Sequence, residues 1–229
     1  MNLKLAEKID SLKQKSIEEL SKKFNCLPEE ICVGDYIARY TDDKVCPYKV
    51  ILGFANFEGS DVTSLGNLEI VYGKKLEDRT GPLLDVNGNQ SYLGINLVDS
   101  KIRSLGNLQQ VYGSITLNED IKSLENVKFL GSNLFLGRTN LQDLGNLEVV
   151  DGMLNFERTS IRTLGKLKKV RKLRIASQSL KSLGDLEWAK EIINATNPRY
   201  RIDRLIDETL IFDGRKYSRI FEDVTTVES

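Results

Sequence analysis

The chain has 229 residues, of which 40% are hydrophobic, and 33 basic side chains balance 33 acidic ones. The zero net charge gives the whole chain no electrostatic attraction to nucleic acid or to an anionic membrane. The sequence contains no histidine, which excludes Ser-His-Asp and Cys-His catalytic arrangements and HExxH zinc sites. No apolar run approaches the ~18 residues of a membrane span, and the charged start of the chain does not resemble a signal peptide.

Residues 1–32 are predicted to form a helical cap. Apolar side chains recur near one helical face within residues 2–25, and Ser16-Ile-Glu-Glu19 fits a capping box that begins a second helix. We interpret this segment as a lid on the domain that follows, and docking on a partner is the alternative. The apolar residues of the face are Leu5, Ile9, Leu12, Ile17, Leu20 and Phe24.

The three cysteines, Cys26, Cys32 and Cys46, are too few and too irregularly spaced for a disulfide framework or a zinc site. We therefore expect reduced thiols and a cytoplasmic protein.

Residues 33–193 contain a repeated phrase of about twenty residues. It reads Ser-Leu-Gly-Asn-Leu-Glu-Ile-Val-Tyr-Gly at 64–73 and Ser-Leu-Gly-Asn-Leu-Gln-Gln-Val-Tyr-Gly at 104–113. Degraded copies begin at Ser123, Asp143, Thr163 and Ser182. A fixed period of this size predicts a solenoid in which each copy is one coil stacked on the next. The glycine is expected to supply a left-handed turn, and the asparagine to hydrogen-bond the local main chain.

Each copy carries an alternating apolar pair followed by apolar residues at three-residue steps. Period two followed by period three predicts a short strand and then turns, so that stacked strands form a parallel sheet with a rise of ~4.8 Å per coil. The pairs are Ala55/Phe57, Ile95/Leu97, Ile115/Leu117, Leu134/Leu136, Leu154/Phe156 and Leu173/Ile175. The first column after them is Val62, Ile102, Ile121, Leu141, Ile161 and Leu180, and three more columns follow three, six and nine residues later.

Two parts of the predicted solenoid are irregular. In the first coil, Tyr36, Ala38 and Tyr40 are expected to form the strand, with Val45 in the apolar column. Residues 74–93 have the length of one coil but few core residues, so they are either a degenerate coil or a loop that replaces one. Residues 194–229 are predicted to be a second cap, with a helix starting at Asn197-Pro198 and a hairpin turning at Asp213-Gly214.

The columns resemble the leucine-rich-repeat family, whose L-x-x-L-x-L-x-x-N-x-L pattern is matched by residues 150–161. Ser60, Ser100, Thr139 and Thr159 stand where the family has its ladder asparagine. The twenty-residue period and the Val-x-Gly lead-in are similar to the L domains of receptor ectodomains. The resemblance implies a right-handed parallel β solenoid whose strand face binds proteins, and it implies no reaction. Together with the predicted caps, the expected fold class is mainly β with α caps.

Side chains between the buried strand positions are predicted to face solvent in rows one coil apart. The first row is Asn56, Asn96, Thr116, Phe135, Asn155 and Arg174. The second row includes Asn118, and the third includes Arg138 and Arg158. An exposed Phe135 beside polar neighbours fits a protein contact, and a misjudged register is the alternative.

A cluster of basic residues is the strongest local charge anomaly. Between 158 and 181 there are nine bases and no acid, a belt of about +9 that favours an acidic protein face over nucleic-acid phosphates. The alternative is a solvated surface balanced by acids of the C-terminal cap. The nine bases are Arg158, Arg162, Lys166, Lys168, Lys169, Arg171, Lys172, Arg174 and Lys181.

We therefore predict a non-enzymatic protein-binding module without metal or cofactor. Two alternatives are a nucleic-acid binder that uses the belt and a polysaccharide hydrolase that uses the carboxyl groups of Asp99 and Glu119. The oligomeric state stays open because end strands can pair. The predicted partner-binding residues are Asn96, Phe135, Arg138, Asn155, Arg158, Arg162, Lys168, Lys172 and Arg174.

Overall fold

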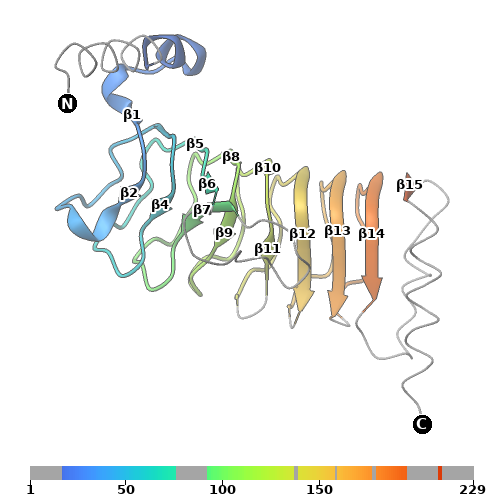
Figure 1. The fold of residues 1–229 in the computed structure, drawn as a ribbon. Helices are drawn as coiled ribbons and strands as arrows, with labels where there is room; N and C mark the ends of the chain where they lie inside the picture. The colour runs from blue at the N-terminus through green and yellow to red at the C-terminus, as the bar shows by residue number, and fades with distance from the viewer. Residues whose placement is uncertain are drawn as a thin grey trace, which may run out of the picture.

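The computed structural model describes residues 17–75, 92–136, 139–157, 159–176, 179–194 and 211–212. They form a mainly β structure, a parallel β-solenoid of about seven turns spaced by about 19 residues (Figure 1). Besides the strands, these residues contain one α-helical segment, 17–24, and two 3-10 turns, η1 (Pro28–Glu30) and η2 (Ala38–Tyr40). The predicted fold class is therefore confirmed.

The strands form one sheet of 15 strands that folds around the core, so that each coil contributes to two faces. The first face contains β1 (Ile31–Cys32), β3 (Val50–Ile51), β5 (Ile70–Val71), β8 (Gln110–Val111) and β10 (Phe129–Leu130). The second face contains β2 (Tyr36–Ile37), β4 (Ala55–Asn56), β7 (Tyr92–Asn96), β9 (Ser114–Thr116) and β11 (Leu134–Phe135). The bends that carry the Ser-Leu-Gly-Asn phrase form a third face, with isolated parallel bridges such as Ser123 to Asp143.

Three longer strands join the first and second faces at the C-terminal end of the stack. They are β12 (Val149–Glu157), β13 (Lys169–Ala176) and β14 (Trp188–Asn194). The register between β12 and β13 shifts between Val150 and Met153, where β12 carries one extra residue as the chain turns the corner. Ile211–Phe212 form β15, which pairs in parallel with Trp188 and Ala189. The predicted C-terminal helix and the second hairpin strand lie outside the described residues.

From Ala55 onward, the core follows the six-residue columns predicted from the repeats. Every residue of the alternating pairs and of the four apolar columns is at most 9% exposed, and all of them belong to one continuous cluster. Parallel pairing places Val71 beside Val111, Val111 beside Leu130 and Leu130 beside Val150. The recurrent aliphatic side chains therefore form a single spine along the solenoid axis.

The repeated phrase is explained by a turn that its first residue caps. The Oγ of Ser64 accepts a hydrogen bond of 3.0 Å from the backbone N–H of Gly66. The same bond recurs in the five later copies, with Oγ, Oγ1 or Oδ1 as acceptor. The third residue needs a left-handed backbone, and Glu125 adopts it with φ of 49° where the other copies have glycine. The phrase is thus a local capping device.

The asparagines of the phrase join neighbouring coils, which differs from their expected local role. Asn126 Nδ2 donates to the carbonyl oxygen of Gly106 over 2.8 Å, and Asn107 Nδ2 donates to that of Gly66 over 3.5 Å. Both acceptors belong to the preceding coil. The side chain therefore fixes the stacking of one turn on the next.

The first coil departs from the prediction in register. Val45 forms a parallel bridge with Ser64, so the next residue, Cys46, takes the position of Leu65. Accordingly Val45 is 50% exposed and Cys46 only 2%. Tyr36 and Ala38 are buried as expected, but Tyr40 lies in η2 with 75% exposure. The prediction for Val45 and Tyr40 was wrong because this coil fills the spine with a small thiol that the aliphatic pattern does not mark.

Residues 74–93 add no coil to the stack. The strands on either side of them pair directly, with Ala55 beside Ile95 and Ile70 beside Gln110. The two ends of the segment pair with each other in the antiparallel sense through β6 (Lys74–Lys75) and β7. The segment is therefore an insertion rather than a degenerate coil. The sequence offers four candidate core residues in this segment: Leu76, Leu83 and Val86 lie outside the described residues, and Tyr92 begins β7.

The described helix covers the outer side of the first face instead of closing the end of the solenoid. Ile17, Leu20 and Phe24 pack in a cluster with Ile31, Val50 and Ile70, which lie on β1, β3 and β5. The neighbouring residues Ile51 and Val71 point into the main core. The apolar side chains of this amphipathic helix therefore pack against the outer side of the first face.

Candidate functional site

The predicted outward row of the second face exists and lies in register. Parallel pairing places Asn56 beside Asn96, Asn96 beside Thr116, Phe135 beside Asn155 and Asn155 beside Arg174. Neighbouring positions are therefore one strand spacing, ~4.8 Å, apart. Asn56, Asn96 and Arg174 are partly exposed and Thr116 is exposed, whereas Asn155 is only 9% exposed.

The two asparagines at the N-terminal end of the row organise the turns that follow them. Asn56 Oδ1 accepts a bond of 3.1 Å from the N–H of Glu58, and Asn96 Oδ1 accepts one of 3.1 Å from the N–H of Val98. Asn96 Nδ2 also donates to Glu58 Oε2 over 3.0 Å. These bonds fix the orientation of the two amide groups, so the polar groups of the row are already positioned for a binding partner.

At the other end of the row, Arg174 Nη1 donates to Asn155 Oδ1 over 3.4 Å. The guanidinium group is thus oriented along the face by its neighbour on β12. The backbone of Phe135 continues the row, while its side chain lies outside the described residues, as do Arg138 and Arg158. The structure therefore brings together Asn96, Asn155 and Arg174 among the predicted site residues.

Three bases of the belt, Lys168, Arg171 and Lys172, pair with acids from the coils on either side. Lys168 Nζ lies 3.1 Å from Glu148 Oε2, and Arg171 Nη2 lies 2.8 Å from Asp151 Oδ1. The hydrogen bond to Glu148 raises the pKa of the Lys168 ammonium group. Each of these acids precedes its base by exactly one coil, so stacking places them side by side. The acids expected to balance the belt, in the C-terminal cap, lie outside the described residues.

Lys172 has the most enclosed of these pairs. Its Nζ lies 3.2 Å from Glu191 Oε2, and the two side chains are 19% and 21% exposed. Lys166 Nζ donates to Asn146 Oδ1 over 2.7 Å, and Lys169 lies over the Trp188 ring at 5.1 Å. Arg162, on the third face, is exposed. The belt thus carries fewer uncompensated charges than the count of nine bases suggests.

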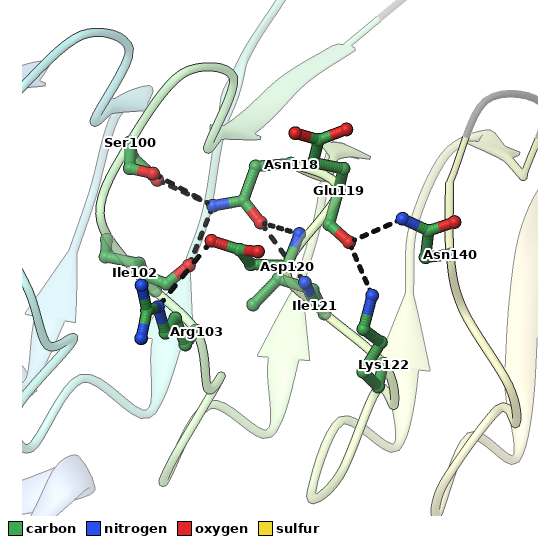
Figure 2. Close-up of polar contacts among 9 residues, drawn as sticks. All are labelled: Ser100, Ile102, Arg103, Asn118, Glu119, Asp120, Ile121, Lys122 and Asn140. Atoms are coloured by element: carbon green, nitrogen blue, oxygen red, sulfur yellow. Dashed lines mark hydrogen bonds and ion pairs between the residues drawn. The ribbon is translucent and has the colours of Figure 1, made fainter.

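Asn118, predicted to face solvent, is buried at 9% exposure. Figure 2 shows its amide group between two coils: Nδ2 donates to Ile102 O over 2.7 Å and to Ser100 Oγ over 3.0 Å. Oδ1 accepts from the N–H groups of Asp120 and Ile121 over 3.0 and 3.2 Å. The prediction was wrong because this coil is one residue shorter between its strand and its bend, and the amide fills the gap.

The carboxyl groups considered for glycoside hydrolysis lie around this shortened turn. Glu119 is exposed, and Figure 2 shows its carboxylate pointing away from the network while its carbonyl oxygen accepts from Lys122 and Asn140. Asp99 is also exposed, at a left-handed backbone position with φ of 52°. Among the described residues, no hydrogen bond or ion pair links the carboxyl group of Asp99 with that of Glu119.

Within the part of the chain that the structure describes, no group of three or more Cys, Asp or Glu side chains is arranged to hold a metal ion. None of the described helices is long and apolar enough to cross a membrane. All three cysteines are free thiols. Comparison with protein-family models, with curated proteins and with solved structures found no match to this chain.

The residues that sequence reasoning missed are the tyrosines of Val-Tyr-Gly, which face outward on the first face. Tyr72 and Tyr112 stack with ring centroids 4.8 Å apart. The signal for them was present, because a tyrosine directly after a core valine must point to the opposite side of a strand.

Proposed function

We propose that this chain is a non-enzymatic protein-binding solenoid of leucine-rich-repeat type, which contacts an acidic partner across its second face. The observation that carries the proposal is the row from Asn56 to Arg174, which lies in register over successive parallel strands. Asn56, Asn96, Thr116 and Arg174 keep solvent exposure. A regular polar row on a rigid sheet offers a partner several preformed hydrogen-bonding positions at low entropic cost.

The charge distribution favours an acidic partner. Arg174 is the last charged position of the row, beside Ile193 on β14, and Arg162 is exposed on the bend that follows β12. The paired bases nearby, such as Lys168 and Arg171, keep their charges near the surface even though Glu148 and Asp151 compensate them. Surface pairs of this kind exchange partners at small cost. An acidic face can therefore compete for these bases as it approaches Arg162 and Arg174.

The leucine-rich-repeat assignment is supported by the buried polar residues at the ladder positions, and right-handed winding is what that resemblance implies. Ser60 and Thr159 are 4% and 9% exposed, and Asn118 binds backbone groups of two coils. A ladder residue in the family satisfies backbone groups of adjacent turns, which is what Asn118 does here. The free thiols support a cytoplasmic location, where cysteines stay reduced.

The test is affinity capture with the full chain from its native lysate, followed by binding measurements on the purified partner. We expect Arg162→Glu combined with Arg174→Glu to weaken binding at least tenfold and to reduce its dependence on salt. Arg39→Glu, an exposed charge reversal in the first coil, is the matched control and should leave binding unchanged. Unchanged affinity in the double variant, with circular dichroism showing an intact fold, would contradict the proposal. A linear fall of log affinity with log salt for mixed-sequence oligonucleotides would indicate a nucleic-acid binder instead.

A further inference from the structure

A row of aromatic rings runs along the outer side of the first face. Val71 and Val111 point into the core, so the next residues, Tyr72 and Tyr112, point outward. Their ring planes are 8° apart at a centroid distance of 4.8 Å. Phe129 on β10 continues the row, with its ring 5.0 Å from that of Tyr112. The row therefore crosses three successive strands of the first face.

One end of this row is already covered by an amphipathic helix. The ring of Phe24, at the end of helix 17–24, meets Tyr72 edge-on at 6.2 Å. The same helix buries Val50 to 0% and Ile70 to 8% exposure on β3 and β5. The first face therefore already packs against one helix, whose apolar side chains recur every three to four residues.

The other end of the row continues beyond the helix. Tyr112 is 38% exposed, one of few large hydrophobic side chains that are open to this degree. Phe129 and Val149 beside it are partly exposed. The apolar surface ends at β12 and β13, where Asp151 pairs with Arg171. Two strand spacings of ~4.8 Å separate β8 from β12, about 10 Å, which matches the distance from i to i+7 in an α-helix at 1.5 Å per residue.

The rim of this surface is mainly basic. Lys128, Lys168, Lys169 and Arg171 lie along it, where Glu148 pairs with Lys168, Asp151 pairs with Arg171 and Glu187 follows Lys168 in the next coil. Toward β13, Lys169 lies over the Trp188 ring and has no ion pair among the described residues, so it is the positive charge that a ligand meets at that end. A ligand with apolar side chains on one face and acidic residues toward that end would complement both properties.

We propose that Tyr112, Phe129 and Val149 form a docking surface for an amphipathic α-helix of a partner protein. The helix would be about ten residues long, with apolar side chains at i, i+3 or i+4 and i+7 and acidic residues at the end facing β13. Strand addition does not fit, because the rings lie on the face of the sheet and not at its edge. This surface is on the first face and does not include Arg162 or Arg174, which test the function proposed above, although both proposals use the bases Lys168 and Arg171.

The experiment uses the full chain and a synthetic 14-residue peptide with leucine and phenylalanine on one helical face and glutamate residues at one end. Fluorescence anisotropy should show saturable binding that Tyr112→Ser weakens about tenfold. Tyr40→Ser, which changes the most exposed tyrosine among the described residues, should leave affinity unchanged. A peptide with lysine in place of glutamate should bind more weakly. Equal binding of a scrambled peptide, whose apolar residues share no face, would overturn the proposal.

A second measurement locates the binding site and tests whether a second copy of this chain occupies it instead of a helix. In NMR titration the amide signals of residues 110–112, 129–131 and 149 should move, and those of the second face should not. Shifts confined to other surfaces would refute the assignment. So would light scattering that shows a dimer of this chain which Tyr112→Ser dissociates, because the aromatic row would then be covered by a second copy.

Discussion

The regular coils, residues 95–176, and the first coil, residues 31–52, bury their interiors by different means. A regular coil stacks between two neighbours and fills its interior with Leu, Ile and Val, as Leu124 and Leu147 do at 0% exposure. The first coil has a described neighbour on one side only. It closes the spine with the ring of Tyr36, which meets Tyr48 at 5.4 Å and Phe57 at 5.5 Å.

Polar contacts complete this aromatic closure. The Tyr36 hydroxyl donates to Asp43 Oδ2 over 2.9 Å, so its polar end is satisfied while its ring is only 5% exposed. Burial raises the pKa of this hydroxyl far above its ordinary value. The difference shows that aliphatic packing is sufficient where both sides of a coil are covered, whereas an end coil needs large rings with a hydrogen-bonded polar tip.

Removing core volume from a regular coil should have the largest effect. Leu147→Ala leaves a cavity between two neighbouring coils and should reduce the free energy of unfolding by about 2–5 kcal/mol. Val45→Ala in the first coil, where the side chain is 50% exposed, should cost less than about 0.5 kcal/mol. Urea denaturation measures both values. Comparable losses would show that Val45 belongs to the spine after all.

Glycine substitutions separate backbone strain from contact between coils. Gly145 and Gly106 have the same left-handed backbone, with φ of 57° and 55°. A Cβ at Gly145 would lie 2.5 Å from the backbone nitrogen of Glu125, whereas one at Gly106 meets nothing within 4 Å.

Gly106→Ala should therefore destabilise by strain alone, about 1–2 kcal/mol. Gly145→Ala adds the clash and should cost about 2–4 kcal/mol in total. Thermal and urea unfolding of the two variants provide the comparison. Equal losses would mean that the coils separate easily at this bend, contrary to the tight stacking described above.

The thiol of the first coil should make stability depend on alkaline pH. Burial raises the pKa of Cys46 from 9.0 to about 11. The unfolded chain loses this proton first, so the contribution to stability is complete below pH 9 and is lost as pH rises toward 11. Two pKa units correspond to about 2–3 kcal/mol.

The measurement is the difference in pH dependence between the native chain and Cys46→Ala. The variant should lack this part of the decline between pH 9 and 11, although its stability at pH 7 will be lower because a buried group has been removed. Parallel profiles for the two proteins would contradict the burial of Cys46 in the spine.

The shortened coil offers the smallest and most local test. Asn118→Ala removes an amide that bridges two coils and leaves the N–H groups of Asp120 and Ile121 without their acceptor, at a cost of about 1–3 kcal/mol. Asn140→Ala, which loses one exposed bond to the carbonyl oxygen of Glu119, should cost under about 0.5 kcal/mol. Hydrogen exchange of the Ile121 amide should accelerate only in the first variant. Acceleration in both variants would show general loosening of the bend.

The regular coils could be predicted in detail, and the irregular ones could not. Each apolar column was correct because a residue repeated at a fixed period must occupy the same environment in every coil. The prediction that Val45 lies in the apolar column was wrong because the first coil has no leucine to mark its register. Only the pairing of Val45 with Ser64 sets that register. The prediction that Asn118 faces solvent was wrong because its coil is one residue shorter, which shifts the turn without changing the apolar columns around it.

The candidate site was predictable in its rows but not in its electrostatics. Strand alternation is sufficient to predict that Asn96, Asn155 and Arg174 share one row, but not that Asn155 is only 9% exposed within it. The belt of bases was overestimated because Glu148 and Glu191 lie outside the basic segment in sequence. They become neighbours of Lys168 and Lys172 only when one coil stacks on the next.

By itself, the sequence determined the period, the inward columns and the capped turn of each copy, because these follow from local backbone geometry and from one hydrophobic environment repeated many times. Only the tertiary structure decided which charged side chains form pairs and how the amide of Asn118 fills the shortened turn. It also decided that the aromatic row on the first face extends beyond the part that helix 17–24 covers. Those outcomes depend on contacts between residues about twenty or more positions apart, whose partners are set by the lateral register of the coils.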